Sequence, residues 1–332
     1  MMRIAFFNNK GGVGRTTLIY HLAHMMADQG SRVLLLDLDP QSNLTAMCIP
    51  EERLEGEFWL EIPSYRPTIL GSLDPALHGL DDLLEPHVEE LRDGLAIVAG
   101  DPGLWAFEDR LSNGLLHTIN RESSAWALSA FHRVASIAET KFAADVVLID
   151  VGPNLGALNR AALLATDFVV TPLTPDVFSI QGMRNLGSTL LDWRRSWQSY
   201  LDHSPTPDPG MPRGHMQPLG YVLMQAGMQL ARPVQAYERW IGRIPGEYRR
   251  SILNDESPPP PIDQDPWNLS FIRNYRGLVL LARDAQKPMF HLKPADGAVG
   301  AYMNAVLRCR QDFDHLATAL VRRAHEMRDA AR

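Results

Sequence analysis

Short apolar runs, rich in β-branched and aromatic residues, alternate along the chain with longer stretches of helical periodicity. The runs predict strands at Ile4–Phe7, Val33–Asp37, Leu95–Val98, Val146–Ile149, Phe168–Pro172 and Gly220–Met224. Between the first two strands the pattern predicts a helix that ends at about Gln29. Such alternation is typical of βαβ units and a parallel sheet. Because the strands are apolar throughout, we expect helices on both faces, in a doubly wound, mostly parallel α/β fold.

Three stretches depart from this alternation. Residues 50–93 hold scattered prolines and acidic pairs and predict an insertion with short helices. Residues 202–218 and the proline-rich 254–266 predict exposed loops. Helical periodicity then returns at Leu278–Gln286 and about Val299–Met327. We predict one domain over residues 1–330, because any boundary would separate a candidate phosphate loop near residue 12 from a candidate metal-side carboxylate, Asp150.

Composition narrows the functional classes only slightly. The 332 residues are 45% hydrophobic and 21% charged, which is ordinary for a soluble globular protein. A net charge of −7 does not favour nucleic acid or an anionic membrane, although a local basic patch can still bind DNA. The two cysteines give no disulfide framework and no zinc spacing. No apolar run approaches the ~20 residues of a membrane span, and no signal peptide precedes the first strand, so we expect a cytoplasmic protein without membrane contact.

A glycine-rich loop with a threonine pair follows the first predicted strand. Gly11, Gly12, Val13 and Gly14 allow several backbone N–H groups to converge on a phosphate, and the next helix begins there with its positive dipole end. Thr16 then has its hydroxyl at the position that binds Mg²⁺ in phosphate loops. A plain glycine-rich turn is the alternative. The order of strand, loop, basic residue, threonine pair and helix favours a phosphate loop.

The loop departs from the general pattern G-x-x-x-x-G-K-[ST], because Asn9 occupies the position of the first glycine. KGGVGRTT at residues 10–17 fits K-G-G-x-G-[KR]-[ST]-T instead, and it resembles the deviant Walker A loop of the ParA/MinD group of dimeric P-loop ATPases, ParA-type partition ATPases most closely. Three further segments are similar to that family: LLLDLDPQSNLT at 34–45, VVLIDVGPNLGALN at 146–159 and VTPLTPDVFSIQGMRNL at 170–186. The resemblance covers about residues 3–190.

The resemblance implies a role for each site residue. Lys10, Gly11, Gly12, Val13, Gly14, Arg15, Thr16 and Thr17 would bind ATP. Lys10 would reach the partner's nucleotide across a dimer interface and, with Asp39 as the residue that positions water, would form the catalytic pair. Thr16, Asp39 and the Walker B residue Asp150 would face Mg²⁺, with Asp37 behind them. Two positions depart from the family: Arg15 replaces a lysine, and one of two prolines after Asp150 is missing.

Two functional hypotheses follow. The first is an ATP- and Mg²⁺-dependent switch that dimerises with itself, binds nonspecific DNA, positions or segregates a cargo, and hydrolyses ATP slowly when a partner protein activates it. The second is a nucleotide-gated regulatory or assembly module with little turnover and no partition role, which Arg15 and the acidic net charge favour. A metabolic P-loop enzyme is disfavoured, because no motif for a second substrate occurs.

Overall fold

The computed structural model describes residues 1–59, 66–78, 80, 82–116, 122–204, 208, 210–224 and 234–330. The chain divides into two compact units. Unit 1 comprises Met1–Phe7, Gly30–Val169 and Thr189–Gln217, and unit 2 comprises Asn8–Gln29, Val170–Ser188 and Pro218–Arg332. Parts of the two predicted insertions, residues 60–65, 79, 81, 205–207 and 209, lie outside the described residues.

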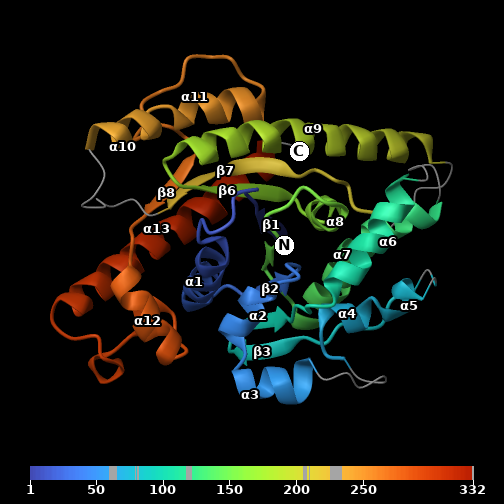
Figure 1. The fold of residues 1–332 in the computed structure, drawn as a ribbon, viewed down its shortest axis with the longest axis horizontal. Helices are drawn as coiled ribbons and strands as arrows, with labels where there is room; N and C mark the ends of the chain where they lie inside the picture. Colours follow the sequence, from blue (N-terminus) through green and yellow to red (C-terminus); the bar gives the residue numbers. More distant parts are fainter. Residues whose placement is uncertain are drawn as a thin grey trace. The chain divides into compact units, whose positions relative to one another are not determined.

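Eight strands form one sheet in the order β3-β4-β2-β5-β1-β6-β7-β8. Figure 1 labels the two strands at the ends of this order, β3 and β8. Their bounds are β1 Met2–Phe6, β2 Val33–Asp37, β3 Glu89–Arg92, β4 Leu95–Val98, β5 Val146–Asp150, β6 Phe168–Leu173, β7 Gln217–Met224 and β8 Asn268–Ile272. The pairs β2–β4, β2–β5, β1–β5 and β7–β8 are parallel, and β3–β4 is antiparallel. The α/β fold with a mostly parallel sheet is therefore confirmed. All six predicted strands are present, within about three residues at each end.

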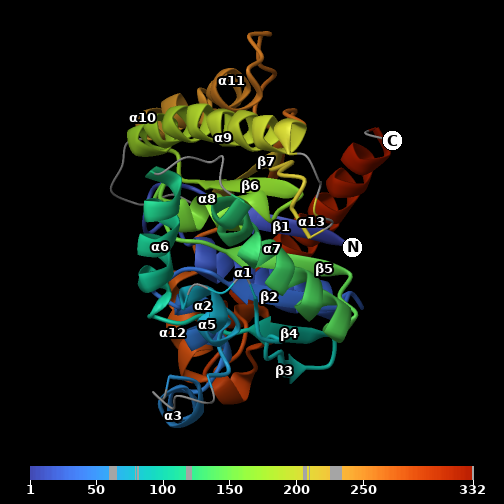
Figure 2. The same cartoon turned by 90° about the vertical axis from the view of Figure 1, so that its right-hand side faces the viewer.

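Unit 1 holds the helices between β2 and β6. They are α2 Asn43–Cys48, α3 Glu51–Arg53, the π-helical turn η1 Leu54–Phe58, α4 Ile69–Ser72, α5 Asp74–Leu77, α6 Leu104–Leu116, α7 Glu122–Phe142 and α8 Ala157–Leu164. Helix α7 packs against β2 and against α8, and α6 packs against both α7 and α8 (Figure 2). The short helices predicted for the first insertion are present in its described part.

Unit 2 holds α1 and the C-terminal elements. They are α1 Arg15–Asp28, α10 Val234–Ile241, α11 Ile244–Tyr248, the π-helical turn η2 Arg249–Leu253, α12 Arg276–Asp284, the 3₁₀ turns η3 Met289–His291 and η4 Pro294–Asp296, and α13 Ala301–Ala330. Helix α13 packs against α1, β8 and α12. Helix α9, Val177–His203, begins in unit 2 and ends in unit 1. Within the described part of the chain, no helix has both the length and the apolar character needed to cross a bilayer.

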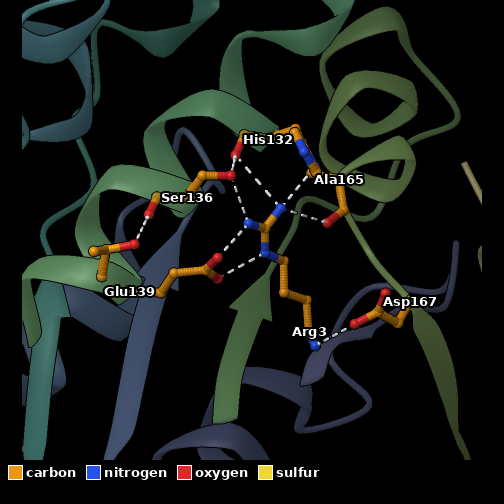
Figure 3. Close-up of polar contacts among 7 residues, drawn as sticks. Arg3, His132, Ser136, Glu139, Ala165 and Asp167 are labelled. Carbon is orange, nitrogen blue, oxygen red and sulfur yellow. Dashed lines mark hydrogen bonds and ion pairs between the residues drawn. The ribbon is translucent and has the colours of Figure 1, made fainter. Parts of the chain in front are cut away.

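The amino end of β1 is held by a buried polar cluster around Arg3 (Figure 3). The guanidinium donates to both carboxylate oxygens of Glu139, at 2.8 and 2.6 Å, and to the hydroxyl of Ser136 at 2.7 Å. It also donates to Nδ1 of His132 at 2.6 Å, which requires a neutral imidazole. Burial, with the charges of Arg3 and Arg133, lowers the pKa of His132 to about 3, so the acceptor nitrogen stays unprotonated. Since every partner is hydrogen-bonded, this buried charge is compensated.

Candidate functional site

The glycine loop adopts the backbone conformation that only glycine accepts easily. Gly12 has φ of 72° and Gly14 has φ of 87°, both in the left-handed region. A methyl group added at Gly11 or Gly12 would meet no atom within 4 Å, so a ligand can approach the loop backbone closely. This part of the loop has the open cradle that a polyphosphate requires.

Helix α1 begins at the end of this loop, as predicted. Gly14 precedes the helix and offers no side-chain cap, and the first turn contains no acidic residue. The N–H groups and dipole of the first turn therefore suit an anion. Arg15 is the first helical residue and is almost fully buried, while Thr16 and Thr17 are half-buried.

Lys10 is held within its own chain. Its ammonium donates to the hydroxyl of Thr174 at 2.8 Å and to Oδ2 of Asp176 at 2.5 Å, and it lies 5.9 Å from the ring centre of the exposed Phe178. Asp176 also caps α9, because its Oδ1 accepts from the N–H of Ser179 at 3.0 Å. Although burial opposes the shift, hydrogen bonds from Lys10, Ser179 and Thr174 hold the pKa of Asp176 below its usual value. The loop lysine and the start of α9 are therefore linked.

The residues before Lys10 fix the start of the loop. The side-chain amide of Asn8 donates to the carbonyl of Pro172 at 2.7 Å, and its Oδ1 accepts from the N–H of Lys10 at 3.0 Å. A Cβ at Gly182 would lie only 2.7 Å from Oδ1 of Asn9, so the backbone of α9 approaches the loop closely. Glycine at 182 therefore permits this contact between α9 and the residues before Lys10.

In unit 1, three aspartates gather at the carboxyl ends of β2 and β5. Asp39 and Asp150 are predicted to face a metal, and Asp37 is predicted to lie behind them. Asp37 and Asp150 are register partners on these adjacent parallel strands, and both are completely buried. Asp37 accepts from the N–H and hydroxyl of Thr45, at 2.9 and 2.7 Å, and so holds α2 against the strand end. Burial, followed by the charge of Asp150, raises the pKa of Asp37 to about 7.

Asp39 lies beside the loop that follows Asp150. Its Oδ1 accepts from the N–H of Gln41 at 3.0 Å, and a Cβ at Gly152 would lie 3.6 Å from that same oxygen. The N–H of Leu38 donates to the carbonyl of Asp150 at 2.9 Å. The structure thus brings Asp37, Asp39 and Asp150 together in unit 1, while Lys10 and residues 11–17 belong to unit 2.

Asn159 shapes the loop between Asp150 and α8. Its side-chain nitrogen donates to the carbonyls of Gly152 and Asn154, at 2.8 and 2.7 Å, and its Oδ1 accepts from the N–H of Gly152 at 3.2 Å. It is fully buried. This one side chain therefore fixes the backbone of the loop at Gly152 and Asn154.

The chemistry of these donors fits ATP and Mg²⁺. Buried carboxylates supply hard oxygen ligands. Burial, followed by the charge of Asp150, raises the pKa of Asp37, and both effects favour a nearby cation. Among the described residues, no group of three or more His, Cys, Asp or Glu side chains is arranged to hold a metal. Mg²⁺ at phosphate sites usually takes only one or two carboxylates together with phosphate and water, so this set is sufficient.

Sequence reasoning missed the residues that hold Lys10. Asp176 and Thr174 lie within the segment TPD, and an aspartate directly before a helical pattern followed by Ser179 is an N-cap signal that could have indicated one of them. Nothing in the sequence indicated that the other oxygen of this carboxylate, Oδ2, would accept from both Lys10 and Thr174. Glu108, which contacts the first turn of α8, was likewise not singled out.

The parallel sheet, the left-handed glycine loop and the strand-end carboxylates define an α/β nucleotide-binding protein of the P-loop class. Residues 1–202 match the family model described as an AAA domain, and the chain belongs to that family. Its relatives include ParA-type proteins, which confirms the resemblance to the ParA family that the loop sequence predicted.

One such relative is the chromosome partitioning protein ParA of Myxococcus xanthus, which is 31% identical over 188 residues, covering 56% of this chain and 57% of that protein. The chain therefore spans a little over half the length of this relative. The crystal structure of protein DIP2308 from Corynebacterium diphtheriae superposes with a TM-score of 0.66 at 27% identity, covering 86% of this chain and 97% of that one. An ATP complex of McdA from Cyanothece shares the fold with a TM-score of 0.61 at 16% identity, covering 96% of each chain.

Proposed function

We propose that this chain is an ATP- and Mg²⁺-dependent dimerising switch ATPase of the ParA type, which positions or segregates a DNA or protein cargo and hydrolyses ATP slowly. The observation that carries the proposal is the left-handed, open glycine loop flanked by Lys10 and Arg15. The ATP complex of a protein with the same fold supports the choice of nucleotide.

In this proposal each site residue has a separate role. The N–H groups of residues 11–17 bind the phosphates, and Arg15 adds positive charge to them. Thr16, Asp39 and Asp150 hold Mg²⁺, which when bound neutralises charge on the phosphates. Asp39 orients the attacking water by accepting its hydrogen bond. Lys10 leaves Asp176 and Thr174 to contact the nucleotide of a second copy.

A nucleotide-gated regulatory module with little turnover is the second candidate. Arg15 favours it, because a planar guanidinium does not reproduce the compact charge of a lysine. The net charge of −7 also disfavours a role that depends on DNA. The two candidates share ATP binding and differ in turnover and in DNA retention, so a hydrolysis assay and a DNA-retention assay separate them.

Sedimentation with ATP, ADP or no nucleotide tests the proposal. We expect ATP, and not ADP, to convert the protein to a dimer, most completely in an Asp39→Ala variant that cannot complete hydrolysis. Lys10→Ala should lose the ATP-driven dimer and hydrolysis while retaining ATP binding, because the phosphates are held mainly by backbone N–H groups. Lys141→Ala, a lysine of unit 1 away from the loop sequence, serves as the control. An Asp39→Ala protein that stays monomeric with ATP would exclude the dimerising switch.

A further inference from the structure

Helix α8 begins seven residues after Asp150 and lacks a capping side chain of its own. The residue before it, Gly156, has extended backbone geometry and no side chain that could accept from the first turn. The free N–H groups at a helix start must find acceptors elsewhere when they are shielded from water.

Glu108 of α6 supplies those acceptors from outside the helix. Its Oε1 accepts from the N–H of Ala157 at 2.8 Å, and its Oε2 accepts from the N–H of Leu158 at 2.7 Å. A carboxylate at a helix start gains both charge-assisted hydrogen bonds and a favourable interaction with the helix dipole. A Cβ at Gly156 would lie 2.4 Å from the same Oε1, so glycine at 156 is what lets the carboxylate reach the helix.

This turn leads directly to the candidate site. Asn159 directly follows Leu158 and donates to the carbonyls of Gly152 and Asn154. Gly152 in turn faces Oδ1 of Asp39. A continuous set of contacts within unit 1 therefore runs from α6 through the first turn of α8 to the loop between Asp150 and Asn159.

We propose that Glu108 is a positioning residue for Mg²⁺ binding: it fixes the first turn of α8 and thereby the loop that sets Asp39 and Asp150. The inference rests on the proposed function, because it assigns Mg²⁺ to those carboxylates. Glu108 itself touches neither nucleotide nor metal in this scheme. Its removal should therefore change the response to Mg²⁺ more than the affinity for the nucleotide alone.

The test compares Glu108→Gln and Glu108→Ala with Asp109→Asn, which removes an exposed carboxylate from the next position of the same helix. Calorimetric titrations of ATP are made at a series of Mg²⁺ concentrations. The Mg²⁺ concentration that gives half of the Mg²⁺-dependent gain in ATP affinity is called the Mg²⁺ midpoint. We expect Glu108→Ala to raise this midpoint about tenfold, as loss of an outer-shell partner commonly does. Glu108→Gln should raise it less, because its amide oxygen still accepts one hydrogen bond. Binding of ATP without Mg²⁺ should be unchanged in all three variants.

Two measurements that do not depend on activity complete the test. Amide exchange at residues 157 and 158 should be faster in Glu108→Ala and unchanged in Asp109→Asn. Gly156→Ala should raise the Mg²⁺ midpoint in the wild-type background and have less effect beside Glu108→Ala, because the clash with the carboxylate is then absent.

The outcomes are distinguishable. A wild-type protein that binds no ATP in the presence of Mg²⁺ overturns the proposed function and this inference with it. Normal Mg²⁺-dependent binding in the wild type, with identical midpoints in Glu108→Ala and Asp109→Asn, overturns the role of Glu108 alone. Additive effects of Gly156→Ala and Glu108→Ala overturn the contact between the two positions.

Discussion

Arg15 is the first residue of α1 and the sharpest departure of the loop from its family. It is 8% exposed, so its guanidinium is enclosed by protein. In the proposed site the ground state of bound ATP should tolerate such a change, because the backbone N–H groups of residues 11–14 would provide much of the phosphate contact. The transition state is less tolerant, because electrostatic stabilisation there depends on the exact placement of each charge.

We therefore predict that Arg15→Lys raises the hydrolysis rate with little change in ATP affinity. Each 1.4 kcal/mol of regained transition-state stabilisation gives about a tenfold faster turnover. Single-turnover hydrolysis measures the rate, and calorimetry measures the affinity. Unchanged or slower turnover in Arg15→Lys would mean that the site has been rebuilt around arginine and that slow hydrolysis has another cause.

At the scale of elements, His21 attaches α1 to the segment before α13. Its Nδ1–H donates to the carbonyl of Thr17 at 2.8 Å, and its Nε2 accepts from the N–H of Met289 at 3.0 Å. Its ring stacks on Phe313 of α13, with centroids 5.2 Å apart. Both nitrogens are used by the neutral ring, so a second proton would face a donor instead of an acceptor.

From these contacts of His21 we predict that the protein loses stability at acidic pH. Burial lowers the pKa of His21 from 6.5 to about 4, with the Thr17 hydrogen bond opposing in part. Between these values the unfolded chain binds a proton that the folded chain does not, so the free energy of unfolding should fall as the pH drops from 6.5 to 4. The full contribution is about 3 kcal/mol. Urea unfolding at pH 7 and pH 4.5 should show a smaller drop in His21→Gln than in the wild type or in the exposed control His325→Gln. Equal drops in all three proteins would show that His21 is not the group that titrates.

The elements that the sequence predicted best are those with a continuous apolar pattern. The five strands predicted between Val33 and Met224 are all present in the structure. They were recognisable because strands buried on both faces are apolar throughout. The sequence did not predict the edge strands β3 and β8. Three of the four residues of β3, EELR, are charged, and β8, NLSFI, contains two polar residues. Polar and charged residues are common in edge strands. Hydrogen bonds between residues far apart in the sequence could not be predicted either, because no local pattern links Glu108 to Ala157 or Met289 to His21.

At the scale of the whole molecule, charge is distributed unevenly. Unit 2 contains 19 Lys and Arg against 14 Asp and Glu, whereas unit 1 contains 13 against 25. The net charge of −7 therefore conceals a basic unit that bears the glycine loop. Exposed arginines of unit 2 include Arg250 after α11 and Arg322 on α13.

We predict that ATP promotes retention on nonspecific DNA and that rising salt reverses it, because each neutralised phosphate releases a counterion. The double variant Arg250→Ala with Arg322→Ala should lower the slope of log affinity against log salt by about 2, roughly one for each lost phosphate contact. Arg195→Ala, an exposed arginine of unit 1, is the control. Fluorescence anisotropy with labelled duplex DNA at several salt concentrations provides the measurement. If no DNA is retained with ATP at low salt, the regulatory-module hypothesis is favoured instead.

The pairing of Lys10 with Asp176 also makes the switch accessible to chemical labelling. Only four lysines occur in the chain, at 10, 141, 287 and 293, so amine-reactive reagents have few competing targets. The Lys10 side chain is 27% exposed, and its ammonium is held by Asp176, so an acylating reagent has restricted access to the nitrogen. Acylation of Lys10 is therefore expected to be slow while the pair persists and to change speed once the side chain leaves Asp176. Mass spectrometry of the peptide that contains residue 10 would then time this movement directly, without any reporter group.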